Sequence, residues 1–481
     1  MKFKLHNSLS KRIEEFHSID KEEVRIYSCG PTVYSYAHIG NMRSFLFADL
    51  LQRTLKVVGN YKVKWVMNIT DIDDKTIRDS KPENGNWNTE MSEPTNDPLV
   101  NLRNFTNFYI DEFIKDIGKV GVLKSDVFLF PKATDHIDEM IELITLIFNN
   151  GFAYIADGNV YFNVSKWREY KQYGRLKKID FENFKKGVRI DADEYDREDV
   201  SDFVLWKNKK EGEPFWNFTL NNQELSGRPG WHLECSAMEK KYLDLPFDIH
   251  TGGVDLQFPH HEDEIAQSHA GYGIDPTKYW SHCEFLEVEG KKMSKSFGNY
   301  FTLRDLEDKG YDTLDIRFAI LSQHYRTKYN FTFDGINSAS KGRKKVQNFI
   351  DELLSDKTGT TSINVIELKH LVYTELAEDL HTPKALAQVF SFVNDYKTSL
   401  FDLKSKEDLI SFFKELNNIF AVWSFELSKV KIPTEIQQLA EERYKAKVNK
   451  DWQLADEIRK QLQSKGYEIK DSKDSYEIIK F

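Results

Sequence analysis

Four side chains suited to bind a transition metal occur between residues 29 and 264. They are two thiols, one imidazole and one carboxylate: Cys29, Cys235, His260 and Glu264. His260 and Glu264 are four residues apart in a segment opened by Pro259, so a helix there would place both side chains on one face. This donor set suits zinc and implies no redox role. Ordinary burial of the cysteines and a solvated acidic helix form the competing interpretation, because the chain has no Cys-x-x-Cys pair.

A second group of residues is suited to hold phosphate. Gly30, Pro31, His38, Gly40 and Asn41 lie in a loop before a predicted helix, and a helix start presents backbone N–H groups to an anion. A histidine there can donate to a phosphate whose charge grows during a reaction. A small residue such as glycine would let a nucleotide approach the backbone closely. Taken alone, this pattern is also typical of ordinary turn chemistry.

The run Lys-Met-Ser-Lys-Ser at 292–296 is a further candidate for phosphate binding. Lys292 and Lys295 are three residues apart and flanked by hydroxyls, which suits a mobile loop that folds over a polyphosphate. A solvated basic loop is the competing interpretation.

The elements that must position these residues follow a strand, loop, helix, strand order. Residues 24–30 and 61–71 are predicted strands, and the helix between them ends at Gly59. This βαβ unit predicts a parallel sheet with a right-handed crossover. Similar signals return at 247–258 and 282–288, whereas 80–97 reads as a polar surface loop. After about residue 340 the pattern is almost entirely helical, and the last 41 residues form a separable small unit.

Composition excludes several classes of protein. The 481 residues are 40% hydrophobic and 14% aromatic, which excludes a disordered or fibrous chain and leaves room for about three domains. No apolar run approaches the ~20 residues of a membrane span, and the opening residues lack the apolar core of a secretory signal. Three cysteines exclude a disulfide scaffold. A soluble, intracellular, multi-domain protein is expected.

Charge is sorted along the chain. The net charge of −10 argues against general nucleic-acid binding but leaves room for a local basic surface. Residues 166–189 hold nine Lys/Arg against three acids with aromatics between them, and 191–202 reverse the sign. This basic stretch predicts either a nucleic-acid contact or a solvated face whose aromatics are partly core, and the pattern does not separate the two.

In combination these residues resemble the cysteinyl-tRNA synthetases, a family of class I aminoacyl-tRNA synthetases. His38-Ile39-Gly40-Asn41 corresponds to the family's variant of the class I His-Ile-Gly-His signature. The resemblance covers nearly the whole chain and is carried by segments 29–34, 38–41, 68–75, 203–207, 227–238, 248–262 and 292–296. Residues 217–222 and 282–284 depart from the family pattern, which blurs local loop geometry but touches none of the proposed ligands or lysines.

The resemblance implies an α/β fold. It consists of a Rossmann-like parallel-sheet catalytic domain with an inserted connective subdomain, followed by a helical bundle and a small C-terminal anticodon-binding domain. The implied bounds are 1–125 and 226–300 for the catalytic domain, 126–225 for the connective insertion, 301–345 for a stem-contact region, 346–432 for the bundle and 433–481 for the anticodon-binding domain.

The resemblance also implies an activity. The chain would be a cytoplasmic, monomeric ligase that activates L-cysteine with ATP and Mg²⁺, and transfers it from cysteinyl-adenylate to the 3′-terminal adenosine of tRNA(Cys). One Zn²⁺ per chain would take the substrate thiolate as a ligand, whereas the hydroxyl of serine is a poor ligand. Two alternatives stay open: a ligase that joins activated cysteine to a glucosaminyl-inositol acceptor, and a non-catalytic zinc-containing RNA-binding protein.

Particular residues receive roles from the resemblance. The metal ligands are Cys29, Cys235, His260 and Glu264, and the catalytic residues are His38, Asn41, Lys292 and Lys295. ATP would contact Gly40, Asp255 and Lys295, while cysteine would contact Cys29, Thr70 and Trp231. His250, His261 and His282 are expected to line the pocket floor, and Cys283 to serve packing. The anticodon would be read by Lys447, Trp452, Asp456 and Asp471, although Trp452 packed in its own core is the competing interpretation.

Overall fold

The computed structural model describes residues 1–88, 90–122, 128–178, 202–293, 298–426, 433–471 and 475–480. It divides into two compact units, residues 1–425 and 426–481. The helical bundle expected as a separate domain belongs to the first unit. Lys295 lies outside the described residues.

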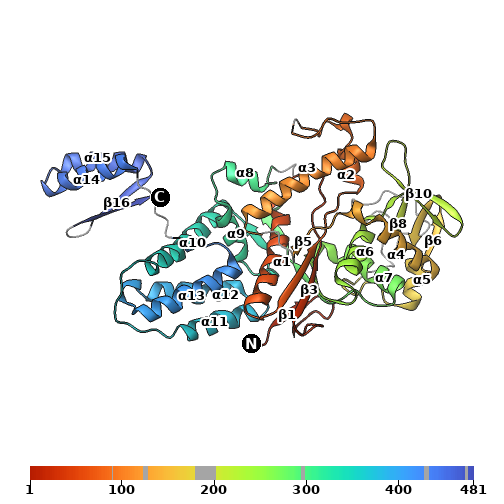
Figure 1. Cartoon of the computed structure of the whole chain (residues 1–481), viewed down its shortest axis with the longest axis horizontal. Helices are drawn as coiled ribbons and strands as arrows, with labels where there is room; N and C mark the ends of the chain where they lie inside the picture. Colours follow the sequence, from red (N-terminus) through yellow and green to blue (C-terminus); the bar gives the residue numbers. More distant parts are fainter. Residues whose placement is uncertain are drawn as a thin grey trace. The chain divides into compact units, whose positions relative to one another are not determined.

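A five-stranded parallel sheet forms the centre of the first unit (Figure 1). Its strands, in spatial order, are β12 (Thr277–Cys283), β11 (Phe247–Gly253), β3 (Glu23–Ser28), β4 (Lys62–Met67) and β5 (Phe128–Leu129). Every neighbouring pair is parallel, as the βαβ pattern predicted. The α/β fold class is therefore confirmed.

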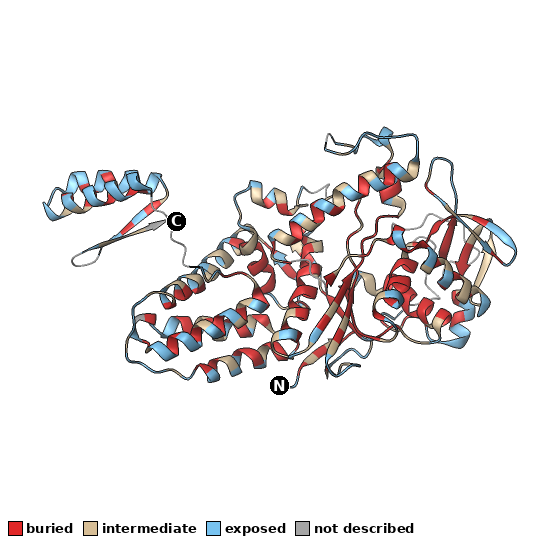
Figure 2. Cartoon of the chain, viewed as in Figure 1, coloured by how far each residue is buried: buried red, intermediate tan, exposed pale blue. Residues whose placement is uncertain are grey.

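Helix α1 (Ile39–Val57) connects β3 to β4. It forms because its apolar residues recur at helical spacing and face the core, where five of them are buried: Phe45, Leu46, Leu50, Leu51 and Leu55. Figure 2 shows α1 and the parallel strands among the most buried elements. The signature turn at 38–41 is thereby anchored to a rigid element.

A second sheet, antiparallel, is inserted between β5 and α6 (Trp231–Leu243). Its strands are β6 (Ala153–Ala156), β7 (Asn159–Phe162), β8 (Phe203–Asn208), β10 (Gln223–Pro229) and β9 (Trp216–Leu220), in spatial order. Two observed strands do not follow the bounds expected from sequence. β5 lies within 126–225 but pairs with β4 of the parallel sheet, and β10 spans the expected boundary at 225. Helix α4 (Ile137–Asn149) packs on α6 and α7 (His260–Tyr272).

The basic stretch after β7 begins in α5 (Val164–Tyr170). Trp167 and Tyr173 are buried in the core, whereas Tyr170 is exposed. The described part therefore follows the interpretation in which the aromatics are partly core. Residues 179–201, which include the rest of the stretch, lie outside the described residues.

The described chain after about residue 340 is helical up to residue 420, as predicted, and further helices precede it from residue 303 on. Its helices are α8 (Leu303–Asp308), α9 (Thr313–Leu321), α10 (Phe333–Leu353), α11 (Val365–Ala377), α12 (Thr382–Asp395) and α13 (Leu403–Phe420), with the short 3₁₀ turn η5 (Thr398–Leu400). Helix α1 contacts α9 and α13, so the bundle packs directly on the helix that carries the signature turn.

Smaller elements complete the first unit. They are β1 (Lys4–Asn7), β2 (Arg12–Glu15), α2 (Asp74–Asp79), η1 (Pro82–Asn84), α3 (Pro98–Lys119), η2 (Ala133–His136), η3 (Val254–Gln257), β13 (Leu286–Val288), β14 (Lys291–Lys292) and β15 (Tyr329–Phe331). Of the predicted surface loop 80–97, Ser80 is buried, and the described residues that follow it are mostly exposed, as predicted. No helix in the described part of the chain is both long and apolar enough to cross a bilayer.

The second unit is a small α/β body with its own core. It contains α14 (Thr434–Val448), α15 (Trp452–Ser464), and an antiparallel pair, β16 (Tyr467–Asp471) and β17 (Tyr476–Lys480). Its hydrophobic core contains Ile436, Ala440, Ile458, Leu462, Tyr467 and Ile469.

A buried ion cluster joins α1 to the bundle. The Arg317 guanidinium, which is fully buried, donates to Asp49 on α1 at 2.6 Å and to the carbonyls of Val120 and Phe420. Arg53 donates to the same carboxylate at 2.8 Å. Burial alone would raise the pKa of Asp49, but Arg317 and Arg53 hold it below its usual value. The carboxylate is therefore the counter-ion that allows the Arg317 cation to be buried.

Asp49→Asn is expected to lower the free energy of unfolding of the first unit by about 3–5 kcal/mol, because it leaves a buried guanidinium without a counter-ion. Urea titration followed by tryptophan fluorescence measures the loss. The control is Glu22→Gln, whose partner Lys62 is 3.8 Å away and solvent-exposed, and it should leave the midpoint unchanged. Equal midpoints for both variants and the original protein would show that the cluster does not stabilise the fold.

Candidate active site and metal centre

A cavity of about 440 Å³ opens at the carboxyl ends of the parallel strands. Cys29 follows β3, Thr70 follows β4, Asp255 follows β11 and Cys283 ends β12, and all four line the cavity. Ligands of open parallel sheets bind at this edge. Gly30 permits the close contact between two strand ends, since a Cβ there would lie 1.7 Å from the carbonyl oxygen of Asn68.

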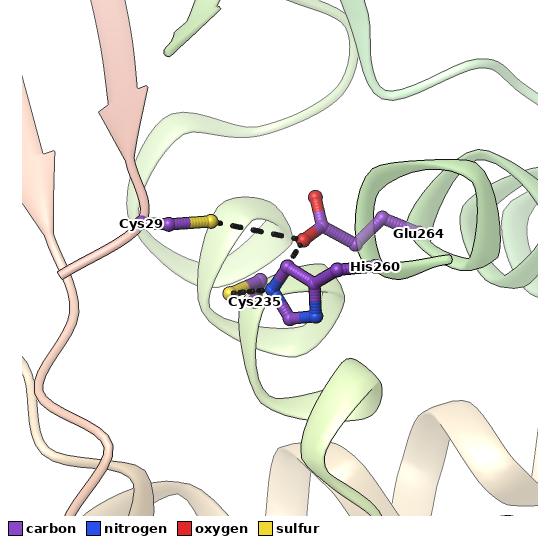
Figure 3. Close-up of side chains that lie close together, drawn as sticks. All are labelled: Cys29, Cys235, His260 and Glu264. Carbon is purple, nitrogen blue, oxygen red and sulfur yellow. Dashed lines mark hydrogen bonds and ion pairs between the residues drawn. The ribbon is translucent and has the colours of Figure 1, made fainter. Parts of the chain in front are cut away.

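The four predicted metal ligands converge on one side of this cavity. Their donor atoms all lie within 4.8 Å of one another, and all four residues are buried (Figure 3). Cys235 Sγ lies 3.5 Å from His260 Nε2. Glu264 Oε1 lies 2.9 Å from the same imidazole nitrogen and 4.0 Å from Cys29 Sγ. His260 and Glu264 both project from α7, as their spacing predicted.

The geometry and electrostatics of this cluster fit a divalent cation. Tetrahedral zinc with bonds of about 2.0–2.3 Å holds its donors ~3.3–3.8 Å apart, and the observed separations bracket that range. Burial raises the pKa of Cys29 to about 12 and that of Cys235 well above its usual value. Thiolates in so dry a site require a positive charge beside them. The cluster is a candidate metal site by its donor types, spacing and burial.

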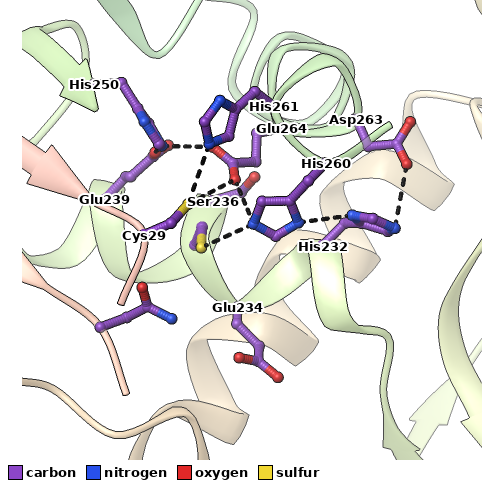
Figure 4. A network of polar contacts seen from close by, with 12 residues as sticks. Cys29, His232, Glu234, Ser236, Glu239, His250, His260, His261, Asp263 and Glu264 are labelled. Atoms are coloured by element: carbon purple, nitrogen blue, oxygen red, sulfur yellow. Dashed lines mark hydrogen bonds and ion pairs between the residues drawn. The ribbon is translucent and has the colours of Figure 1, made fainter. Parts of the chain in front are cut away.

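A shell of buried polar groups surrounds the ligands (Figure 4). His232 Nδ1 lies 2.8 Å from His260 Nδ1, and Asp263 lies 3.5 Å from the other nitrogen of His232. His250 Nε2 lies 2.8 Å from Glu264 Oε2 and 3.0 Å from Glu239. Such outer groups fix the orientation of metal ligands. The sequence pattern did not indicate His232, Glu239 or Asp263 for this role, because none belongs to a local spacing motif.

The three histidines expected on the pocket floor occupy a deeper position. His261 Nε2 lies 3.2 Å from Cys29 Sγ, and His261 Nδ1 lies 2.8 Å from His282. Together with His250 they are fully or almost fully buried, and the described residues that line the cavity do not include them. Two of the three contact the ligands directly, His261 through Cys29 and His250 through Glu264.

Thr70 and Trp231 line the cavity beside the metal ligands. The Trp231 ring stacks on the His260 ring at a centroid distance of 4.3 Å. The Thr70 hydroxyl donates to Glu234 at 2.8 Å. Burial raises the pKa of Glu234 well above its usual value. Glu234 is a further polar residue of the site that sequence reasoning did not assign.

The signature turn lies at the same cavity, where His38 caps α1. The Asn41 backbone N–H donates to His38 Nδ1 at 3.1 Å, and the His38 backbone N–H donates to Asn41 Oδ1 at 3.2 Å. Because Nδ1 accepts a hydrogen bond, the proton of the neutral ring is on Nε2. The cap therefore specifies a tautomer in which Nε2 is a hydrogen-bond donor.

The signature turn and the lysine-containing segment meet at this cavity. A Cβ at Gly40 would lie 2.7 Å from Met293 Cε and 2.9 Å from the His38 ring, so a larger residue there would have to displace one of these two side chains. Lys292 lines the cavity, and its charge opposes the rise in the pKa of Asp255 that desolvation causes. Cys283 is buried and also contributes to the cavity lining.

Residues predicted to read an anticodon lie in the second unit. Trp452 is 60% exposed, so the interpretation in which it packs in its own core is wrong. Asp456 is exposed. The Asp471 carboxylate accepts a hydrogen bond from Arg443 and lies 3.0 Å from Lys447 Nζ. These contacts, the one with Arg443 above all, lower the pKa of Asp471 to about 2. Asp471 is thus engaged within its own unit, whereas Trp452 presents an open ring.

Comparison with solved structures identifies a similar fold. The chain is similar to a methionyl-tRNA synthetase of Mycobacterium tuberculosis solved with methionyl-adenylate, with a TM-score of 0.55 and 13% identity. The similarity covers 83% of this chain and 89% of that one. At this identity the likeness concerns the fold alone.

Comparison of sequences identifies the family. Residues 15–341 match the family described as "tRNA synthetases class I (C) catalytic domain". The chain is 42% identical to a cysteine–tRNA ligase of Brachyspira hyodysenteriae over 97% of both chains. It is 43% identical to a cysteine–tRNA ligase of Leptospira interrogans over 98% of both. With its metal-ligand cluster and signature turn at one cavity, the chain therefore belongs to the cysteine–tRNA ligase family of class I aminoacyl-tRNA synthetases.

Proposed function

We propose that this protein is a cysteine–tRNA ligase that activates L-cysteine with ATP and Mg²⁺ and transfers it to tRNA(Cys), with one Zn²⁺ as its resident metal. The observation that carries the proposal is the juxtaposition of two groups in one cavity. Cys29, Cys235 and His260 of the buried metal-ligand cluster line one part, and the signature-turn residues with Lys292 line another. An amino acid held by its thiol would thereby have its carboxylate directed toward a bound nucleotide.

Zinc in this centre would supply a soft Lewis acid that accepts a thiolate far more readily than a serine hydroxyl. The ring of Trp231, stacked on His260, forms a wall for the amino acid, and the Thr70 hydroxyl offers a polar contact held by Glu234. These residues orient the substrate carboxylate.

In the first step the cysteine carboxylate attacks the α-phosphorus of ATP, and pyrophosphate leaves. His38 donates from Nε2 to an oxygen on which negative charge grows, and Lys292 and Lys295 neutralise the departing phosphates. Asn41 positions the His38 ring through the cap. Gly40 and Asp255 are proposed to contact the nucleotide.

In the second step a ribose hydroxyl of the terminal adenosine takes the cysteinyl group from the adenylate. Trp452 is suited to stack on an anticodon base, because its ring is exposed on a unit outside the catalytic body. Lys447, Asp456 and Asp471 are proposed to contribute polar contacts there. A ligase for a glucosaminyl-inositol acceptor would not require these anticodon contacts.

Exchange of pyrophosphate into ATP tests the proposal. Cysteine should drive the exchange, and serine should be poorer by about 10⁴-fold in kcat/KM, because a site that reads one group directly rejects an analogue without it. Equal exchange with both amino acids would refute metal-based selection. Charging of tRNA(Cys) compared with a glucosaminyl-inositol acceptor then separates the two ligase activities.

A further inference from the structure

We infer that Lys75 and Tyr34 bind the single-stranded 3′ end of the tRNA at the catalytic cavity, Lys75 through a backbone phosphate and Tyr34 by stacking on a base. The inference rests on the proposed function and assigns residues that the activation step does not use. Both residues line the cavity, and Lys75 Nζ lies 5.4 Å from the centroid of the Tyr34 ring. Lys75 is exposed and Tyr34 is half-buried, so both are accessible from solvent.

Lys75 makes no ion pair among the described residues, although its charge acts on the neighbouring Asp73. The Asp74 carboxylate forms ion pairs with Lys207 Nζ at 2.7 Å and with Arg228 Nη2 at 2.6 Å. Asp73 caps α2 and accepts from its backbone N–H groups. Asp79 is paired with Arg78. Among the described residues, no carboxylate lies within 4.0 Å of Lys75 Nζ. A cation left unpaired at a cavity is available to an anionic ligand.

The position of Lys75 separates it from the proposed site of the ATP phosphates. Lys292 and Lys75 are the two lysines among the described residues that line the cavity. Lys292 lies on β14, beside Met293, which approaches the signature turn at Gly40. Lys75 follows β4, on the other side of β3 from β11 and β12. Lys292 and Lys75 therefore belong to different elements around the cavity, and each is suited to bind a different polyanionic reactant.

The pairing of this cation with an aromatic ring indicates which reactant it holds. Single-stranded nucleic acids bind where a positive charge follows the backbone and an aromatic side chain stacks on a base. Tyr36 and Tyr300 are further half-buried tyrosines in the lining, and the Tyr300 ring stands edge-on to His38 at 5.0 Å. The end of an RNA strand entering from solvent would meet Lys75 and Tyr34 before it reaches the amino acid at Thr70.

The test separates the two half-reactions in the full-length, metal-loaded protein. Lys75→Ala should raise the KM for tRNA in charging about tenfold, with cysteine-dependent pyrophosphate exchange changed less than twofold. Lys75→Arg should restore the KM because it keeps the charge. The salt dependence of the KM should weaken by about 0.7 in logarithmic slope in Lys75→Ala, since one phosphate contact is lost. Tyr34→Leu should raise the KM, whereas Tyr34→Phe should not.

Lys62→Ala is the matched control, because Lys62 is an exposed lysine at the opposite end of β4. It should change neither half-reaction. If Lys75→Ala lowers exchange as much as charging, Lys75 serves ATP and the inference is wrong. Unchanged charging in Lys75→Ala would overturn it as well. If the unsubstituted protein exchanges pyrophosphate with cysteine but charges no tRNA, the proposed function is refuted, and this inference with it.

Discussion

Cys235→Ala is expected to reduce the zinc content of the purified protein from one ion per chain to less than about a tenth of that. One of four donors is lost from a buried site, and four-ligand zinc centres derive about 10–16 kcal/mol from the complete set. Affinity should therefore fall by at least about 10²-fold. Cysteine-dependent pyrophosphate exchange should fall by about 10³-fold, because the amino acid loses its anchor. Elemental analysis and the exchange assay measure the two effects.

Cys283→Ala is the matched control for this variant. Cys283 is a buried thiol at the same cavity, but it does not belong to the ligand cluster among the described residues. The control should retain the full zinc content. Full retention in Cys235→Ala would remove that residue from the ligand set, and equal losses in both variants would point to unfolding, which circular dichroism would detect.

His38→Asn should reduce the rate of adenylate formation by about 10²–10³-fold, the usual cost of removing one donor from a developing negative charge. The substitution isolates the chemical role of the ring. Asparagine is among the best helix N-caps, so it should replace His38 Nδ1 as the acceptor for the Asn41 N–H. Single-turnover quench-flow with ATP and cysteine measures the rate, and the thermal midpoint should stay within about 1 °C of the original.

His38→Ala completes the comparison. It should lose the same factor in rate and also about 1 kcal/mol of stability, because alanine cannot cap α1. Should His38→Asn form adenylate at the original rate, the ring would be a structural cap alone. Should only the alanine variant slow the reaction, the effect would come from displacement of the signature turn.

Much of the fold could be predicted from local pattern. The strand, loop, helix, strand order around residue 40 predicted the parallel pairing of β3 and β4, and the apolar spacing of α1 predicted its buried face. Backbone periodicity carries this information because each element buries one side. The position of β5 was missed, since a two-residue strand carries no periodicity.

The candidate site, like the fold, was predicted only in part from the sequence. His260 and Glu264 were placed together by their four-residue spacing on α7. The donor types suited zinc, but ordinary burial of the cysteines competed with that interpretation until the family resemblance was added. The supporting shell was not foreseen. His232 on α6 orients His260, and Glu234 holds Thr70, but no local rule connects these positions.

Residue types and short spacings thus identified the possible metal donors, the helical pair His260 and Glu264, and the glycine-containing turn before α1. Packing of distant segments settled whether those groups meet. Cys29 reaches Glu264 because β3 and β11 are neighbours in the sheet and α7 follows β11, and the rings of His261 and His282 fill the space behind them. Contacts between residues far apart in the chain depend on how sheets and helices stack, and local sequence periodicity does not encode that arrangement.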